Sequence, residues 1–301
     1  MKKCLLCFTV VLLNYAPLFS QFYFYDANHL EPEWRIEAGI SLGIMNCLTD
    51  LGGHKGTGKK FIKDVNWNST KPCGGLFLVV THHDHLGLRV ESTWGALSGA
   101  DSLLKNDPSE ANLRYKRNLH FRSRIREFGA LLEFHPLYLT RSGGSPLSPY
   151  LLLGIGYFHF QPEALFNGSW VSLQPLHTEG EGFREFPDRQ AYKLQQINFP
   201  LGLGLKYDVS RRLVIRLEIL YRILTTDYLD DVSQGYIDPS LFHKYLPPST
   251  AELALRMADR GGELDPLYQT IPGSIRGNPK NKDGYFSLNV KISMVLNRKR
   301  F

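Results

Sequence analysis

The chain has 301 residues and a formal net charge of +6, and no change of composition along it marks a second domain. Its 35 basic residues are spread among 29 acidic ones without a basic run, which excludes a nucleic-acid-binding protein of the basic-patch kind. Beyond the first 20 residues, no segment has the roughly 18 consecutive apolar residues of a transmembrane helix.

The amino terminus predicts a secretory signal peptide over residues 1–20. Two lysines precede an apolar core at residues 5–13, and cleavage is expected near Ser20-Gln21. The core is too short to span a bilayer, which argues against a membrane anchor. Cys4 and Cys7 stand at the start of the core rather than after it, which argues against lipid attachment. We therefore expect an exported protein.

Eight stretches predict β-strands, because apolar and polar residues alternate along most of them and successive strand residues face opposite sides. In the last stretch, Leu288 and Val290 share one face while Ser287 and Asn289 share the other. Globular strands average about 5–6 residues, whereas a tilted membrane strand needs about 9–11. The second stretch is apolar on both faces, and the facing of the fifth is ambiguous. The predicted strands are Trp34–Cys47, Cys73–Thr81, Leu86–Leu97, Arg122–His135, Pro149–Phe160, Lys193–Tyr207, Arg212–Leu224 and Tyr285–Leu296.

The gaps between these strands alternate short and long. Residues 82–85, 136–148 and 208–211 form short connections, and residues 48–72, 98–121, 161–192 and 225–284 form long ones. Short periplasmic turns and long surface loops are typical of outer-membrane barrels. The sequence therefore predicts an all-β fold, an eight-stranded antiparallel up-and-down transmembrane β-barrel, with residues 21–301 as a single outer-membrane β-barrel domain.

The longest predicted surface loop, residues 225–284, also carries a helix signal. Ser249 precedes Glu252 by three residues, the spacing of a capping box. Residues 250–260 have helical composition, and Gly261 suits a helix end. We expect one short surface helix there, which covers the barrel mouth.

Charged residues fall on the inward face of the predicted strands. Opposite charges in a narrow lumen can pair, and eight strands leave an interior that side chains can fill. The pattern favours a salt-bridged plug over a small selective pore. The predicted lumen residues are Arg35, Glu37, Arg89, Glu91, Glu127, Glu133, Lys206, Arg216, Glu218, Arg222 and Lys291.

Three other groups of residues contain side chains of the kinds found at metal or catalytic sites. The turn with His82, His83, Asp84 and His85 has metal-ligand residue types, but adjacent residues at a strand end point apart, so we interpret it as a solvated turn. Three aspartates suit calcium but lack the glycine and terminal glutamate of an EF-hand loop. These are Asp227, Asp230 and Asp231.

Histidines near the predicted loop end could serve a membrane enzyme whose active site lies at the barrel rim. They are His120, His159 and His177, with Asp227 and Asp230 as nearby carboxylates. No strained nucleophile motif such as G-x-S-x-G accompanies them. We therefore predict no catalytic residues, no cofactor, no metal site and no enzyme activity.

Two cysteines remain after signal removal, Cys47 and Cys73. They lie at the loop ends of the first two strands, which are neighbours in an up-and-down barrel. An exported protein can keep a disulfide, so we expect a bridge between them, the alternative being two buried thiols.

Four segments resemble a family of outer-membrane β-barrels of Bacteroidota that includes PorG, the barrel component of the type IX secretion system. The segments are residues 118–128, 148–160, 173–182 and 226–233, and the likeness covers most of the mature chain. The resemblance implies a link to a periplasmic ring built from a lipoprotein and its soluble partner, and it implies no catalytic residues. The insertion at residues 238–283 is longer than the family pattern.

The sequence thus predicts a non-enzymatic outer-membrane barrel with a structural or assembly role, linked by resemblance to type IX protein secretion. The expected partners are outer-membrane lipids and the secretion-ring lipoprotein with its soluble partner. The alternatives are a small-solute channel, a surface adhesin and the rim-site enzyme.

Overall fold

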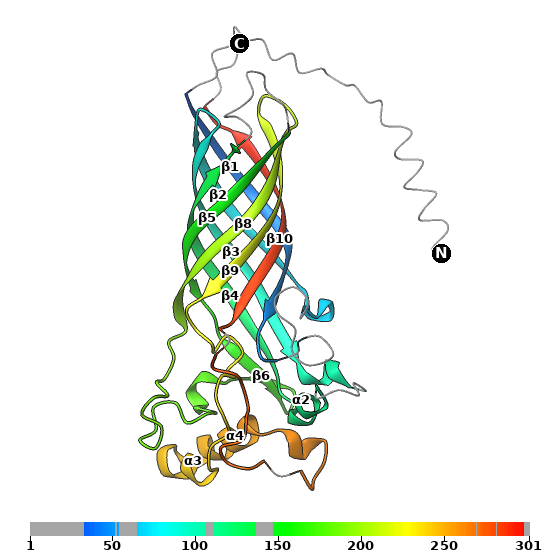
Figure 1. The fold of residues 1–301 in the computed structure, drawn as a ribbon, viewed down its shortest axis with the longest axis vertical. Coiled ribbons are helices and arrows are strands. Elements are labelled where there is room, and N and C mark those ends of the chain that lie inside the picture. Colours follow the sequence, from blue (N-terminus) through cyan, green and yellow to red (C-terminus); the bar gives the residue numbers. More distant parts are fainter. Residues whose placement is uncertain are drawn as a thin grey trace, which may run out of the picture. The chain divides into compact units, whose positions relative to one another are not determined.

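The computed structural model describes residues 33–51, 53, 65–105, 111–136, 147–268, 270–280 and 282–297. The predicted signal peptide and most of the turn at residues 136–148 lie outside them. Eight of the described strands form the barrel wall (Figure 1). They are β1 (Trp34–Leu48), β2 (Lys71–His82), β3 (Leu86–Ala100), β4 (His120–Phe134), β5 (Leu147–His159), β8 (Gln195–Asp208), β9 (Leu213–Leu224) and β10 (Gly284–Val295).

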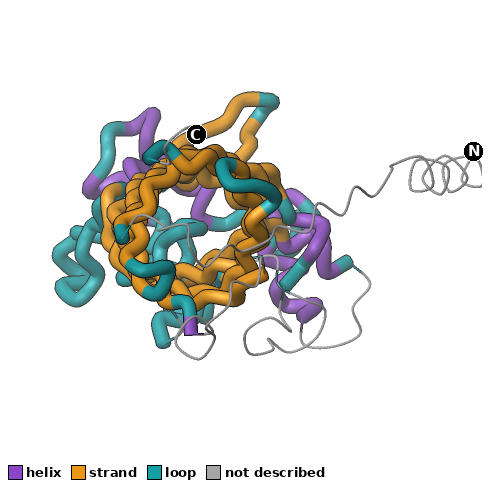
Figure 2. Tube along the Cα trace, turned by 90° about the horizontal axis from the view of Figure 1, so that it is seen from above, coloured by secondary structure: helices purple, strands orange, loops and turns teal. Residues whose placement is uncertain are grey.

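These eight strands close into an antiparallel ring, which Figure 2 shows end on. Each pairs with its neighbours in the chain, and β1 closes the ring against β10, from Glu37 opposite Val295 to Leu48 opposite Gly284. The prediction of an eight-stranded antiparallel up-and-down barrel is confirmed. We call the end with the β2–β3 and β8–β9 turns the turn end and the other end the loop end.

Several strands run past their predicted ends. β3 and β4 stay paired as far as Ala100 opposite His120, beyond the end of the apolar and polar alternation. Alternation reports which face a side chain occupies, whereas a strand ends where its backbone pairing ends. The loop ends of β3 and β4 therefore extend beyond the stretch that the sequence pattern marks.

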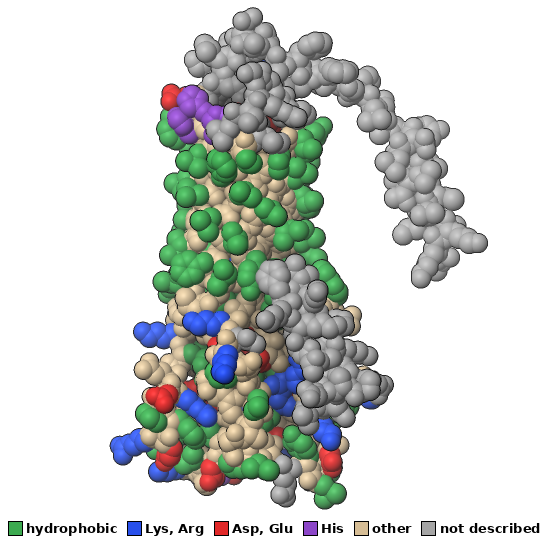
Figure 3. Space-filling model, in the orientation of Figure 1, with side chains coloured by type: hydrophobic (Ala, Val, Ile, Leu, Met, Phe, Trp, Pro, Cys, Tyr) green, Lys and Arg blue, Asp and Glu red, His purple; other side chains and the backbone are tan. Residues whose placement is uncertain are grey.

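The outer face of the barrel is apolar, and its belt of hydrophobic side chains covers the middle of the molecule in Figure 3. The two strands of unclear facing join it. In β2, Leu76 and Leu78 are exposed while Phe77 is buried. In β5, Leu151 is exposed and its neighbour Leu152 is buried. An uncharged outer band with a polar interior is the reverse of a soluble barrel and suits a lipid surrounding.

The long loops carry further elements. A hairpin of β6 (Pro162–Phe166) and β7 (Ser169–Ser172) joins the edge of β4, where Arg122 is opposite Glu163. None of the helices among the described residues is long and apolar enough to cross a membrane. The helices are α2 (Ala111–Arg117), α3 (Ser240–Tyr245) and α4 (Pro248–Ala258), with 3-10 turns η2 (Trp67–Ser69), η3 (Asp101–Leu104), η5 (Gln174–Leu176) and η6 (Gly261–Glu263).

The helix expected at residues 250–260 is α4, but its start differs from the prediction. Pro247 is the N-cap and Pro248 occupies the first turn, where the missing N–H costs nothing. No side chain caps the helix, so the Ser249 capping box does not form. Gly261 begins η6 instead of ending the helix.

The described parts of the long loops pack into one body at the loop end, which we call the cap. It has an apolar core of its own, drawn from the segments between β5 and β8 and between β9 and β10. The buried members are Ala164, Leu173, Leu176, Phe183, Ile237, Phe242, Ala251, Ala254, Met257 and Ala258. The loops are therefore a packed structure over the barrel mouth.

Candidate functional site

The structure places all eleven predicted lumen charges inside the barrel. Each is at most 6% exposed. Six are cations and five are carboxylates, and burying unpaired charges would be costly. Their pairing therefore decides whether the interior is a pore or a plug.

The middle of the interior is built around Arg89. Its guanidinium binds both carboxylate oxygens of Glu218, at 2.6 and 2.9 Å, and also pairs with Glu133. Lys291 reaches Glu218 at 3.0 Å and Glu91 as well. One cluster of charges from β3, β4, β9 and β10 thus crosses the lumen. Two-pronged arginine–carboxylate pairs of this kind are geometrically specific.

Tyr150 completes this cluster, although the sequence interpretation did not include it. Its hydroxyl donates to Glu218, and its ring lies against Arg89, 5.9 Å from the guanidinium carbon. Gly204 on the neighbouring strand makes room for the ring, because a Cβ atom there would lie 2.2 Å from Tyr150 Cζ. The signal that was available is a tyrosine hydroxyl within a mostly apolar strand.

A second group of charges fills the turn end. Arg216 binds Glu37 at 2.8 Å, and Arg35 binds Glu37 at 2.9 Å and Asp208 at 2.6 Å. Asp84 of the β2–β3 turn lies 3.7 Å from the Lys206 amine. Asp84 and Asp208, which were not among the predicted lumen residues, thus join Glu37 in balancing the three cations of this group.

A third group lies toward the loop end. Arg222 binds Glu127 at 3.1 Å and Ser287 Oγ at 2.6 Å. Tyr285 also donates to Glu127, and Asn198 donates to the Tyr285 hydroxyl at 3.1 Å. Every carboxylate among the predicted lumen residues is therefore paired with a cation inside the barrel.

Beyond this third group an apolar cluster closes the barrel mouth. Aromatic rings stack through it, with centroids 5.5 Å apart for Phe158 and Phe160 and 4.7 Å apart for Tyr192 and Tyr228. Buried aliphatic residues such as Met45 and Leu97 pack around them. The interior is thus occupied by three groups of ion pairs and then by this apolar plug.

The predicted disulfide between Cys47 and Cys73 is absent, and both are free, buried thiols. The strand register explains the separation, because Cys73 lies opposite Gly43, four residues before Cys47. Four strand residues span about 13 Å, whereas a disulfide needs Cα atoms within about 7 Å. Cys47 Sγ faces Ser98 O at 3.6 Å and Cys73 Sγ faces Asn289 Oδ1 at 3.4 Å.

Two buried arginines hold the cap together. Arg117 binds Asp101 at 2.8 Å and the Asp50 carbonyl at 2.9 Å. Arg276 binds Glu179 at 2.8 Å and the Asp231 carbonyl at 2.6 Å. Arg117 also donates to the Arg276 carbonyl. These contacts join all four long connections, so the cap is fastened over the mouth as a unit.

The three aspartates considered as calcium ligands accept hydrogen bonds from backbone N–H groups and hydroxyls of the protein. Asp230 accepts from the backbone N–H groups of Leu51 and Val232, both at 3.0 Å. Asp231 accepts from the hydroxyls of Thr178 and Tyr192. Asp227 accepts from the Ser233 hydroxyl at 2.7 Å. The carboxylates therefore serve different segments and do not converge on one point among the described residues.

Burial of acidic groups in the cap alters their titration. Burial, together with the charges of Asp231 and Glu179, raises the pKa of Glu181 from 4.5 to about 8. Burial likewise raises the pKa of Asp227 from 3.8 to about 7. The cap therefore binds protons near neutral pH that an unfolded chain would release.

The histidines weighed for a rim enzyme have separate surroundings. His120 Nε2 accepts from the Leu165 backbone N–H at 2.9 Å. His177 adopts a left-handed backbone and packs against Phe183, 5.9 Å between ring centroids. His159 ends β5, where it is opposite Arg126 on one side and Gln195 on the other. No two of these histidines belong to one group of possible metal ligands among the described residues.

Comparison with known proteins returned no matching family model and no matching curated protein. Several solved outer-membrane proteins are similar. Neisserial surface protein A matches with a TM-score of 0.39 and 8% identity over 88% of this chain and 98% of that one. Ail, the attachment invasion locus protein of Yersinia pestis, in complex with the heparin analogue sucrose octasulfate, matches at 0.37 and 10% over 87% and 99%. A major outer membrane protein from Thermus thermophilus matches at 0.37 and 12% over 87% and 99%. With TM-scores below 0.5, the barrel assignment rests on the strand pairings of this chain.

Proposed function

We propose that this protein is a non-enzymatic integral outer-membrane β-barrel that acts as a structural or assembly component and does not act as an open channel. The observation that carries the proposal is the occupied lumen, in which buried ion pairs around Arg89 and Arg222 are followed by an apolar plug. Charges that bind one another at these distances do not present a wet, charged path to solutes.

The outer surface supports the membrane location. Exposed apolar side chains such as Leu42, Leu88 and Leu203 come from strands around the barrel, and the band in Figure 3 is nearly free of charge. In outer-membrane barrels the long loops face the outside and the short turns the periplasm. The cap then lies at the cell surface, and the turn end lies in the periplasm after signal cleavage near Ser20-Gln21.

The finer proposal is a role in type IX protein secretion, supported by the family resemblance. The barrel would then bind a periplasmic ring lipoprotein, with its soluble partner, through the turn end. The β8–β9 turn offers Val209 as an exposed apolar side chain beside the exposed Arg211 and Arg212. A stable interface buries about 1,200–2,000 Å² in total, so this turn would contribute only part of it.

Co-purification from native membranes tests this role. The variant Arg211→Glu/Arg212→Glu at the turn end should weaken recovery of the ring lipoprotein, because it reverses two charges at the proposed interface. A cap variant, Leu267→Ser/Ile271→Ser, should recover the lipoprotein like the native protein. Loss of the lipoprotein with the cap variant but not with the turn variant would refute the role. Heat-modifiable migration on gels checks that both variants fold.

A surface adhesin is the second candidate, and exposed apolar side chains of the cap favour it. Leu267, Ile271 and Ile275 are 88%, 72% and 85% exposed, although large apolar side chains are usually buried. An exposed apolar patch often marks a protein-binding surface. If this role holds, serine at all three positions should abolish adherence of cells to host-protein-coated surfaces while leaving co-purification unchanged. Unchanged adherence would exclude these three side chains as the binding surface.

A further inference from the structure

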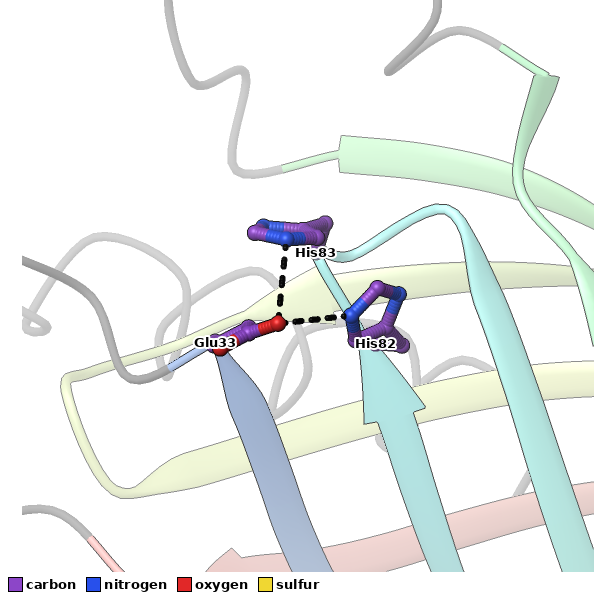
Figure 4. Close-up of side chains that lie close together, drawn as sticks. All are labelled: Glu33, His82 and His83. Carbon is purple, nitrogen blue, oxygen red and sulfur yellow. Dashed lines mark hydrogen bonds and ion pairs between the residues drawn. The ribbon is translucent and has the colours of Figure 1, made fainter.

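A carboxylate and two imidazoles meet at the turn end, outside the lumen and the cap. Glu33 directly precedes β1, His82 ends β2 and His83 begins the β2–β3 turn. Glu33 Oε1 lies 3.1 Å from His82 Nε2 and 3.6 Å from His83 Nε2. Figure 4 shows a nitrogen of each ring directed at that one oxygen.

The backbone explains why neighbouring histidines share one partner. Trp34 is opposite His82 in the β1–β2 pair, and the His83 N–H donates to the Glu33 carbonyl at 2.9 Å. His83 has a φ of +46°, in the left-handed region, so the strand alternation that would separate the two rings ends there. Their centroids are 4.2 Å apart. The sequence argument that adjacent residues at a strand end point apart does not hold for this turn.

The acidic residue of the turn, Asp84, pairs with cations of the lumen. Asp84 lies 3.8 Å from Arg35 and 3.7 Å from Lys206, both in the lumen. The four turn residues His82, His83, Asp84 and His85 therefore do not act as one group. The carboxylate beside the two imidazoles comes from Glu33 and not from Asp84. Among the described residues, Glu33, His82 and His83 are the only three His, Cys, Asp or Glu side chains whose ligand atoms all lie within 4.8 Å of one another.

We infer that Glu33, His82 and His83 form a binding site for a divalent transition-metal ion of the zinc class. Imidazole nitrogens with a carboxylate oxygen suit zinc and its late first-row neighbours, whereas calcium and magnesium prefer oxygen ligands alone. Two atoms bonded at about 2.0–2.1 Å to one tetrahedral ion lie about 3.3–3.4 Å apart. The two carboxylate-to-imidazole distances, 3.1 and 3.6 Å, bracket that separation.

The surroundings leave the site accessible and partly ordered. The side chains of His82, His83 and Glu33 are 39%, 57% and 61% exposed, so an ion can enter and keep water at its remaining positions. The Trp34 ring packs on His82 with centroids 4.4 Å apart, which holds that imidazole in place. A bound ion would fasten the start of β1 to the β2–β3 turn.

Calorimetric titration of the full-length, untagged protein in detergent with Zn²⁺ tests the site. We expect one saturable equivalent, with no comparable binding of Mg²⁺ or Ca²⁺. His83→Asn should lower the affinity at least tenfold, since loss of even an outer-shell partner of a metal costs about 10–100-fold. Asparagine tolerates the left-handed backbone at this turn position, so the hairpin should be kept. Glu33→Gln should also weaken binding.

The matched control is His243→Asn, which removes an exposed histidine at the opposite end that pairs with Glu252 at 3.6 Å. It should bind Zn²⁺ like the native protein. Equal affinity of the native protein and His83→Asn, absence of a saturable equivalent, or an equal loss with His243→Asn would each overturn the proposal. X-ray absorption at the zinc edge should show imidazole scattering in the native complex and less of it in His83→Asn, and unchanged scattering would also contradict the site.

Discussion

Removing the central arginine of the lumen should destabilise the barrel strongly. Arg89 is fully buried and pairs with Glu133 and Glu218, and more weakly with Glu91 at 3.4 Å. In Arg89→Met, Lys291 can still pair with Glu91 and Glu218, but among the described residues the ion pair left to Glu133 is the one with His135, at 3.4 Å. Breaking a buried pair by removing one partner costs about 3–5 kcal/mol, which is roughly a 100- to 4,000-fold change in the folding equilibrium.

Urea unfolding in lipid vesicles, followed by tryptophan fluorescence, measures this cost. With slopes of about 1–3 kcal/mol per molar urea, the midpoint should fall by at least about 1 M. The double variant Arg89→Met/Glu133→Gln should recover part of the loss, because it removes the stranded carboxylate. Lys244→Met is the control, since Lys244 pairs with Glu185 on the exposed cap. An Arg89→Met midpoint equal to that of Lys244→Met would refute the paired-lumen account.

Three further experiments test other parts of the structure. Leu217→Arg on the lipid face should cost about 2–4 kcal/mol in vesicle unfolding if it lies near the midplane, and a neutral effect would mean that this face does not meet lipid. Thiol labelling of the denatured, unreduced protein should label both Cys47 and Cys73. If neither is labelled, the two cysteines form a disulfide after all. Glu181 has a pKa raised to about 8 in the folded protein, so the folded state holds its proton more tightly than the unfolded chain. Its contribution to stability is therefore full below about pH 4.5 and is lost as the pH rises toward 8. Limited proteolysis of the cap should accelerate between pH 5 and pH 8, less steeply in Glu181→Gln, and equal pH dependence of the two proteins would contradict this.

The barrel and the facing of most of its strands could be predicted because both depend on local alternation. Leu288 is exposed and Ser287 is buried, as the pattern of the last strand requires, and a one-residue slip would exchange them. The facing of β2 could not be predicted from alternation, because its inward residue Phe77 is apolar like its outward residues. The structure explains the residue, since Phe77 lies 5.3 Å from the Arg89 guanidinium and 5.0 Å from the Lys291 amine and packs among the cations.

The packing of the cap could not be predicted, because it depends on long-range contacts that the alternation of residues along a strand does not indicate. Arg276 and Glu179 are 97 residues apart in the chain, and nothing near either one indicates the other. The β6–β7 hairpin had a local signal that the sequence interpretation missed, the Asn167-Gly168 pair, both with positive φ. The left-handed backbone of His83 had only a weak signal, because histidine is enriched in that region among non-glycine residues but is common elsewhere as well. Long-range pairs and single backbone conformations therefore account for most of what the sequence did not predict.

Single-channel recording from the purified protein in planar lipid bilayers tests the closed lumen most directly. The ion pairs around Arg89 and the stacked rings from Phe158 to Tyr228 occupy the path that ions would need. We predict a stable baseline without conductance steps for the native protein, with protein insertion verified by heat-modifiable migration after recovery from the bilayer. Reproducible, long-lived conductance steps of the native protein would contradict the plugged barrel and favour the small-solute channel.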